Sequence, residues 1–172
     1  PWGSTHEKTW HLVKTLPHVS GLFVWTGFDY LGEPTPYWWP SRSSFFGIVD
    51  LAGFPKDVYY MYKSEWTDEP VLHIFPHWNW KEGERVDIWA YYNNADEVEL
   101  YLNGKSLGVR QKTDSTYHVS WRVPFTPGTL RAVSRLGGKE VLVKEIHTAG
   151  EPARLVLTPD RSVIQADGSD LS

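Results

Sequence analysis

The sequence contains no cysteine and no apolar run that approaches 18 residues. Without cysteine there is no disulfide, no thiolate zinc ligand and no cysteine nucleophile. A membrane-spanning helix needs about 20 predominantly apolar residues, so the sequence also predicts no membrane span. Lysine and arginine number 17 against 21 aspartates and glutamates, which gives a formal net charge of −4. This balance predicts no basic surface for nucleic acid or anionic lipid.

Length sets a second limit on the fold. A chain of 172 residues is long enough to bury a hydrophobic core, and it has room for one or two domains. It is too short for a complete (β/α)8 barrel, which needs about 250 residues. Ten tryptophans are the one unusual feature of the composition. They suit a large core, and they also suit a surface that binds sugars.

The most informative stretch is residues 21–39, which read GLFVWTGFDYLGEPTPYWW. Residues 22–25 form an unbroken apolar run, which is typical of a strand buried on both faces of a parallel sheet. The rest contains Asp29, Glu33, several aromatic residues and too much glycine and proline for regular structure. Carboxylates and aromatic rings thus follow the carboxyl end of a predicted parallel strand, where α/β folds bind ligands.

Two helices are expected on either side of this strand and loop. Ser4 and Glu7 have the spacing of a capping box, and the apolar positions that follow predict a helix over residues 5–16. Pro55 is suited to the start of a second helix. The apolar stripe of that helix comprises Val58, Met61, Tyr62 and Trp66.

From about residue 67 the apolar period changes to that of a strand. Apolar and polar residues alternate in several runs, which indicates antiparallel sheet with one buried face. Asn103-Gly104 and Gly137-Gly138 are typical of two-residue hairpin turns, because a type I′ turn needs positive φ at both positions. Seven strands are expected, near residues 71–75, 85–92, 97–102, 105–109, 117–124, 129–135 and 139–147. This number is typical of an immunoglobulin-like sandwich.

Four sequence runs resemble a known family of enzymes. The run FVWTGFDYLGEPTPY, followed by FFGIVDLAGFPKDVYYMYKSEW, is similar to the eighth strand, active-site loop and last helix of the barrel in family 2 glycoside hydrolases, the β-galactosidase and β-glucuronidase group. The runs FPHWNW and VELYLNGKSLG resemble the β-sandwich that follows that barrel. The resemblance covers nearly the whole chain, but only the C-terminal part of such an enzyme.

The resemblance implies a division of the chain into three parts. Residues 1–66 would be the last αβα piece of a (β/α)8 barrel, and residues 67–147 the seven-stranded immunoglobulin-like sandwich. Residues 148–172 would be a linker and the first strands of a further sandwich domain. Because this last part is too short to close a core, we expect it to be poorly ordered or docked on its neighbour. The predicted fold is mainly β.

Three residues are expected to contact substrate: Trp25, Asp29 and Glu33. A retaining glycosidase needs two carboxyl groups about 5 to 5.5 Å apart, and Asp29 and Glu33 could be considered as that pair. The resemblance instead implies that both catalytic glutamates lie on earlier barrel strands. This chain is therefore expected to hold no catalytic residue. The resemblance places Trp25 in the wall of the sugar pocket, where its indole offers a flat apolar face. The alternatives are a barrel-core role for Trp25 and turn formation for the two carboxylates.

The sugar is less well defined than the reaction. Some β-galactosidases of the family carry an asparagine just before the glycine that corresponds to Gly47, and this chain has Phe46 there. A preference for galactose therefore does not follow from the resemblance.

The motif around His73 and His77 has alternative explanations. Histidines four apart share a zinc-binding face only on a helix, and Pro76 argues against a helix. No metal and no cofactor is therefore expected. For Trp78 and Trp80 we expect packing of the sandwich against the barrel piece, with sugar binding as the alternative.

Three functional hypotheses follow. The first is a C-terminal fragment of a retaining, β-galactosidase-like hydrolase that cleaves terminal β-linked sugars from glycans and is inactive alone. The second is a carbohydrate-binding or adhesion module, and the third is a structural spacer. The resemblance implies a periplasmic or secreted protein, with any signal peptide upstream of Pro1. Because the strand predicted at residues 22–25 lacks its barrel neighbours, we also expect self-association or an unusual packing on the sandwich.

Overall fold

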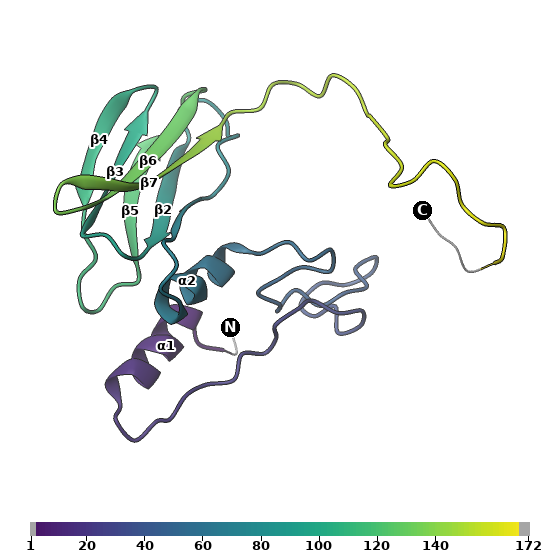
Figure 1. Cartoon of the computed structure of the whole chain (residues 1–172), viewed down its shortest axis with the longest axis horizontal. Helices are drawn as coiled ribbons and strands as arrows, with labels where there is room; N and C mark the ends of the chain where they lie inside the picture. Colours follow the sequence, from purple (N-terminus) through teal and green to yellow (C-terminus); the bar gives the residue numbers. More distant parts are fainter. Residues whose placement is uncertain (1–2, 169–172) are drawn as a thin grey trace.

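A computed structural model of the chain describes residues 3–168, which form a β-sandwich, two helices packed against it and an extended C-terminal segment (Figure 1). The elements are α1 (His6–Thr15), α2 (Asp57–Trp66), β1 (Leu72–Phe75), β2 (Arg85–Tyr92), β3 (Glu97–Leu102), β4 (Lys105–Arg110), β5 (His118–Pro124), β6 (Thr129–Leu136) and β7 (Lys139–His147). Each strand begins and ends within one residue of its predicted position, so the mainly β fold is confirmed. No helix in the described residues is long and apolar enough to cross a membrane.

The strands form two antiparallel sheets, one in the order β1-β2-β5 and the other in the order β4-β3-β6-β7. In the constant-type immunoglobulin fold the fourth strand lies in the same sheet as the first, second and fifth strands. In this protein the fourth strand lies in the other sheet. Here a tight hairpin holds β4 beside β3, with Leu102 opposite Lys105 and φ angles of 50° and 79° at Asn103 and Gly104. Gly137 has a φ angle of 55° in the hairpin between β6 and β7. Both hairpins were predicted, because positive φ at paired turn positions favours these residues.

The core lies between the two sheets and is built from alternate strand positions. On β2, for example, Val86 and Ile88 are buried and Asp87 is exposed. The buried cluster comprises Leu72, Ile74, Trp78, Val86, Ile88, Ala90, Tyr92, Val98, Leu100, Val119, Trp121, Val123, Phe125, Leu130 and Ala132. The indole nitrogen of Trp121 donates to the carbonyl of Gly108 at 3.0 Å, so its polar atom has a partner inside the protein.

The tryptophans of the FPHWNW motif close one end of this core. Trp78 is 1% exposed, lies 5.0 Å from Phe125 between ring centroids, and donates from Nε1 to the carbonyl of Thr126. Trp80 is partly buried against the same cluster and stacks on His77 with ring centroids 4.8 Å apart. The expectation that they join the sandwich to the preceding segment is wrong, because the connection after β1 folds back over the sandwich's own core.

Both helices begin later than predicted. The N-cap of α1 is Thr5, whose Oγ1 accepts a hydrogen bond from the Lys8 N–H at 3.3 Å, so the Ser4–Glu7 capping box is wrong. Helix α1 ends before Leu16, which has the extended conformation that a following proline favours. Helix α2 begins two residues after Pro55, with Met61 and Tyr62 on its buried face.

The strand predicted at residues 22–25 is not formed. Phe23 is fully exposed and Trp25 is 74% exposed, and neither belongs to a strand or bridge. A parallel strand needs a neighbour to bond its backbone groups, and within residues 3–168 no strand lies beside this run. The helix–strand–helix expectation is therefore wrong, and the segment between α1 and α2 is an irregular loop (Figure 1).

Candidate functional site

The candidate site is the loop between α1 and α2, which is held by its own backbone. The Asp29 N–H donates to the carbonyl of Val49 at 2.9 Å, and the Val49 N–H donates to the carbonyl of Gly27 at 3.0 Å. Gly47 lies where these two segments run together, and a Cβ added there would sit 2.2 Å from the Asp29 nitrogen. Only glycine permits this approach.

Asp29 holds the two segments around Gly27 and Gly47 together from inside the loop. Its side chain is 7% exposed, its Oδ1 accepts from the Gly47 N–H at 2.8 Å, and its Oδ2 lies 2.7 Å from Lys56 Nζ. Lys56 also donates to the carbonyl of Phe45 at 3.2 Å. Both oxygens of Asp29 thus have protein partners, which favours the structural role that the sequence left as an alternative. Sequence reasoning missed the contacts of Asp29 with Gly47 and Lys56, because no local pattern pairs these residues.

Tyr30 links Trp25 to Glu33. The rings of Trp25 and Tyr30 meet edge to face, with centroids 6.3 Å apart and planes at 84°. The Tyr30 hydroxyl donates to Oε2 of Glu33, and this hydrogen bond raises the pKa of Tyr30 because the carboxylate stabilises the protonated phenol. An exposed indole, a phenol and a carboxylate therefore lie in a row, separate from the inward-facing Asp29. Sequence reasoning missed Tyr30, because residue spacing does not predict which side chains meet in an irregular loop.

More apolar side chains are exposed along the same loop. We call them the apolar loop surface: Phe23, Trp25, Phe28, Leu31, Tyr37, Trp38, Trp39, Phe45, Leu51 and Phe54. Some of these side chains pack on neighbours. The ring centroids of Tyr37 and Phe45 are 4.5 Å apart, and the Arg42 guanidinium lies 4.6 Å from the ring centroid of Trp39. Large exposed apolar patches on soluble proteins mark binding sites or interfaces.

Helices α1 and α2 lie below the sandwich in the view of Figure 1, and α2 contacts β1 and β2, so the helices connect the loop to the β1-β2-β5 sheet. Met61 of α2 packs in a buried cluster with Tyr91 of β2 and with Tyr117, which directly precedes β5. Glu7 of α1 accepts a hydrogen bond from the Tyr91 hydroxyl at 3.0 Å and lies 2.8 Å from Nδ1 of His118. Burial raises the pKa of Tyr91, so it remains a donor.

Glu65 of α2 is the centre of a second polar cluster. Its side chain is 8% exposed and accepts from Lys14 Nζ at 2.8 Å and from Trp10 Nε1 at 3.0 Å, while Lys112 Nζ lies 3.6 Å away. Burial opposes ionisation of Glu65, but the two hydrogen bonds and the charge of Lys112 together lower its pKa. Burial also lowers the pKa of Lys112, against the attraction of Glu65. The Glu65 carboxylate thus links α2 both to α1 and to the segment between β4 and β5.

Mild acid is expected to weaken the contact between α1 and α2. Nδ1 of His6 lies 2.9 Å from the Tyr62 hydroxyl, and burial lowers the pKa of His6 below its ordinary value of 6.5. A group with a lowered pKa in the folded state stabilises the fold fully above its unfolded pKa and loses that contribution as the pH falls through the folded value. The free energy of unfolding should therefore decrease from about pH 7 to about pH 5. In denaturant titrations at a series of pH values, His6→Asn, whose side chain does not titrate, should show a smaller decrease in the free energy of unfolding. Equal decreases in the parent and the variant would contradict the assignment.

The chain thus combines an immunoglobulin-like sandwich with a loop of exposed aromatic rings, and comparison with known proteins identifies relatives that share its sequence and fold. A family model described as a domain of unknown function (DUF4982) matches residues 83–142. The chain is 64% identical over 171 residues to the β-galactosidase BoGH2A of Bacteroides ovatus, a match that covers 99% of this chain and 20% of that protein.

Two solved structures extend the comparison. A β-glycosidase from Bacteroides vulgatus aligns with a TM-score of 0.80 and 37% identity, over 95% of this chain and 21% of that one. A family 2 glycosyl hydrolase from Bacteroides cellulosilyticus aligns with a TM-score of 0.77 and 32% identity, over 95% of this chain and 26% of that one. The chain corresponds to a C-terminal part of a family 2 glycoside hydrolase, and it spans about a fifth to a quarter of the length of these relatives.

Proposed function

We propose that this chain forms part of the sugar-pocket wall and the accessory sandwich of a retaining, β-galactosidase-like glycoside hydrolase that cleaves terminal β-linked sugars from glycans. The observation that carries the proposal is the exposed row of Trp25, Tyr30 and Glu33 in a chain 64% identical to a β-galactosidase. The Trp25 indole packs against the C–H face of a sugar ring, and Glu33 accepts hydrogen bonds from sugar hydroxyls. The sugar contact predicted for Asp29 stays a prediction. Its two oxygens already contact Gly47 and Lys56 within the loop.

The catalytic acid/base and nucleophile are proposed to lie outside this chain. A retaining pair faces one substrate with carboxyl groups about 5 to 5.5 Å apart. Asp29 is turned inward to Lys56, whereas Glu33 is exposed and bonded to Tyr30. The two carboxylates therefore do not face one substrate.

The isolated chain is expected to release no nitrophenol from nitrophenyl β-galactoside above the buffer blank, because it lacks a catalytic pair. A longer protein that contains this segment and the preceding barrel residues should be active. In that protein Trp25→Ala should lower kcat/KM by at least about tenfold, since a stacked aromatic ring contributes more than about 1.4 kcal/mol. Trp66→Ala on α2 is the matched control for loss of an indole. Turnover by the isolated chain that Glu33→Gln abolishes would contradict the proposal.

We also propose that the chain is divided functionally at the predicted boundaries. Residues 1–66 serve as a barrel piece, residues 67–147 as the sandwich, and residues 148–172 as a linker and the first strands of a further sandwich domain. The exposed leucines of the C-terminal segment support the last assignment, since Leu155 is 96% exposed and Leu157 is 95% exposed. Such side chains are typical of a strand whose partners lie elsewhere.

The isolated chain is expected to self-associate through the apolar loop surface. In the Bacteroides ovatus relative the match spans only 20% of the protein, so other residues are available there to cover this surface. In the isolated chain a second copy would take their place. Light scattering after size exclusion should give a mass that rises above 19.8 kDa with concentration. The double variant Phe23→Ser, Trp38→Ser should remain monomeric, and a monomeric parent at all concentrations would contradict this expectation.

A further inference from the structure

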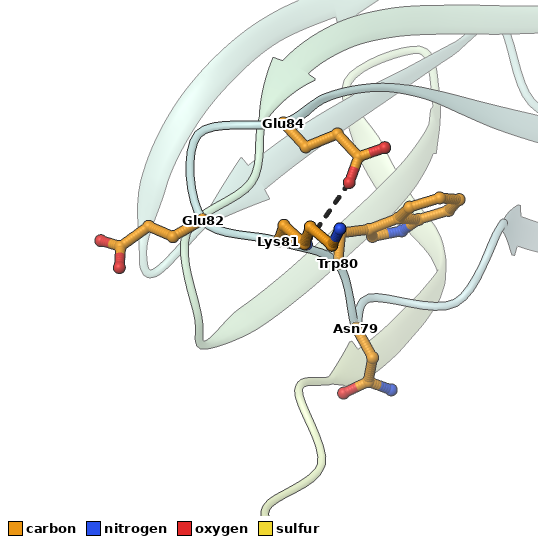
Figure 2. Close-up of a pocket in the computed structure, with 5 residues that line it drawn as sticks. All are labelled: Asn79, Trp80, Lys81, Glu82 and Glu84. Atoms are coloured by element: carbon orange, nitrogen blue, oxygen red, sulfur yellow. Dashed lines mark hydrogen bonds between the residues drawn. The ribbon is translucent and has the colours of Figure 1, made fainter.

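A second surface feature lies in the connection between β1 and β2. A hollow of about 640 Å³ is lined there by Asn79, Trp80, Lys81, Glu82 and Glu84 (Figure 2). The C-terminal segment leaves the sandwich beside it, since the Ala149 N–H donates to Oδ1 of Asn79 at 2.7 Å. The hollow is built by residues far from the apolar loop surface in sequence, and it shares no residue with the Trp25–Glu33 row.

The backbone of the hollow is fixed where Gly83 and Glu84 meet Phe125. The Gly83 N–H donates to the carbonyl of Phe125 at 3.0 Å, and the Phe125 N–H donates to the carbonyl of Glu84 at 2.7 Å. Gly83 has a φ angle of 82°, which favours glycine and sets the tight turn between Lys81 and Glu84. A frame that is already ordered loses little conformational entropy when it binds a ligand.

Trp80 supplies a fixed aromatic surface in this frame. Its Nε1 donates to the carbonyl of His77 at 2.8 Å, and the His77 ring stacks on it with planes at 12°. The ring also packs partly against the sandwich core. The indole is therefore held in one orientation, with one face covered by His77, and it still lines the hollow, where a sugar ring can pack against it.

The polar groups around Trp80 are available to a ligand. Among the described residues, the Lys81 ammonium and the Glu82 carboxylate have no side-chain partner, and Glu84 accepts only the Lys81 N–H at 3.4 Å. Carboxylates accept hydrogen bonds from hydroxyl groups, and the ammonium donates them. Two carboxylates against one ammonium disfavour an anionic ligand, because like charges repel.

We propose that this hollow is a second binding site, for neutral sugar units of a glycan chain. One sugar ring stacks on Trp80 beside Glu84 and Lys81, and a neighbouring ring of the same glycan bonds to Glu82, whose carboxylate points away from Trp80 (Figure 2). The site binds without cleaving and anchors the glycan beside the sandwich. It goes beyond the proposed function, because it does not depend on the Trp25–Glu33 row or on catalysis.

The test is a titration of the ¹⁵N-labelled chain with neutral β-galactotriose and, separately, with trigalacturonate. Neutral sugar should shift the Trp80 indole N–H and the backbone amides of residues 79–84 in a saturable way, and the acidic sugar should bind several-fold more weakly. Glu82→Gln should weaken neutral binding by about tenfold, the loss expected for a hydrogen bond to a charged group. It should also reduce the difference between the two sugars, which a purely structural effect would not do.

Matched variants separate this site from the loop. Trp80→Ala should abolish the shifts at residues 79–84, and Trp38→Ala should leave them unchanged. Glu82 is exposed and has no side-chain partner among residues 3–168, so Glu82→Gln keeps the test valid if Trp80→Ala fails to fold. Absence of saturable shifts at residues 79–84, or shifts that Glu82→Gln does not weaken, would overturn the proposal. Shifts confined to residues 25–33 would overturn it too, while leaving the proposed pocket wall intact.

Discussion

Replacement of Trp78 by alanine should lower the melting temperature of the sandwich by at least about 12 °C. Trp78 is 1% exposed, and truncation of a buried tryptophan costs about 3–5 kcal/mol through lost burial and a remaining cavity. The change also leaves the carbonyl of Thr126 without its indole donor. In a domain of this size each 1 kcal/mol shifts the melting temperature by about 4–8 °C. The loss is a large part of the 5–15 kcal/mol that typically stabilises a whole domain.

Trp38→Ala is the matched control for this experiment. It removes the same side chain from a position that is 89% exposed, so its effect should stay within about 0.5 kcal/mol. Circular dichroism in the far ultraviolet, recorded during heating, reports the sheet directly. If the two variants melted together, Trp78 would not be part of the sandwich core.

Gly47→Ala should open the loop between α1 and α2 while the sandwich stays folded. The new Cβ would lie 2.2 Å from the Asp29 nitrogen and 2.6 Å from the Val49 carbonyl oxygen, and backbone atoms on both sides leave it no room. The two segments must separate, which breaks the hydrogen bonds between them and the contact of Asp29 with residue 47. Amide exchange at Asp29 and Val49 should accelerate by at least about tenfold, which corresponds to about 1.4 kcal/mol of local stability.

The neighbouring Gly27→Ala serves as the control. A Cβ at Gly27 meets nothing within 4 Å, so exchange at Asp29 and Val49 should remain close to that of the parent. Amides of β2 and β3 should be unaffected in both variants. Unchanged exchange in Gly47→Ala would show that the loop does not depend on this close approach.

The sandwich was predictable because its signals are local. Alternation along a run such as Val86-Asp87-Ile88 decides which side chains face the core, and Asn103-Gly104 decides where the chain reverses. The strand predicted at residues 22–25 failed for the opposite reason. An apolar run indicates that a segment can be buried, but it does not say whether partner strands exist in the same chain.

The candidate site was only partly predictable. Trp25 and Glu33 were named from a family resemblance, and the structure shows that Tyr30 connects them. The inward turn of Asp29 depends on Lys56 and on the absence of a side chain at Gly47, contacts between segments that no periodicity records. The start of α1 was wrong by one residue because Ser4 and Thr5 are both good capping residues.

The cluster around Glu65 limits how this protein can be recombined with its relatives. Glu65 belongs to α2 and bonds Lys14 of α1, but Lys112 comes from the sandwich. A chimera joined between α2 and β1 would replace Lys112 with whatever residue the donor sandwich carries there, leaving a buried carboxylate with less compensating charge. A crossover placed before α1 would transfer all three residues together. The sandwich and the two helices should therefore be exchanged as one unit, although the chain passes between helical and strand structure in the middle of that unit.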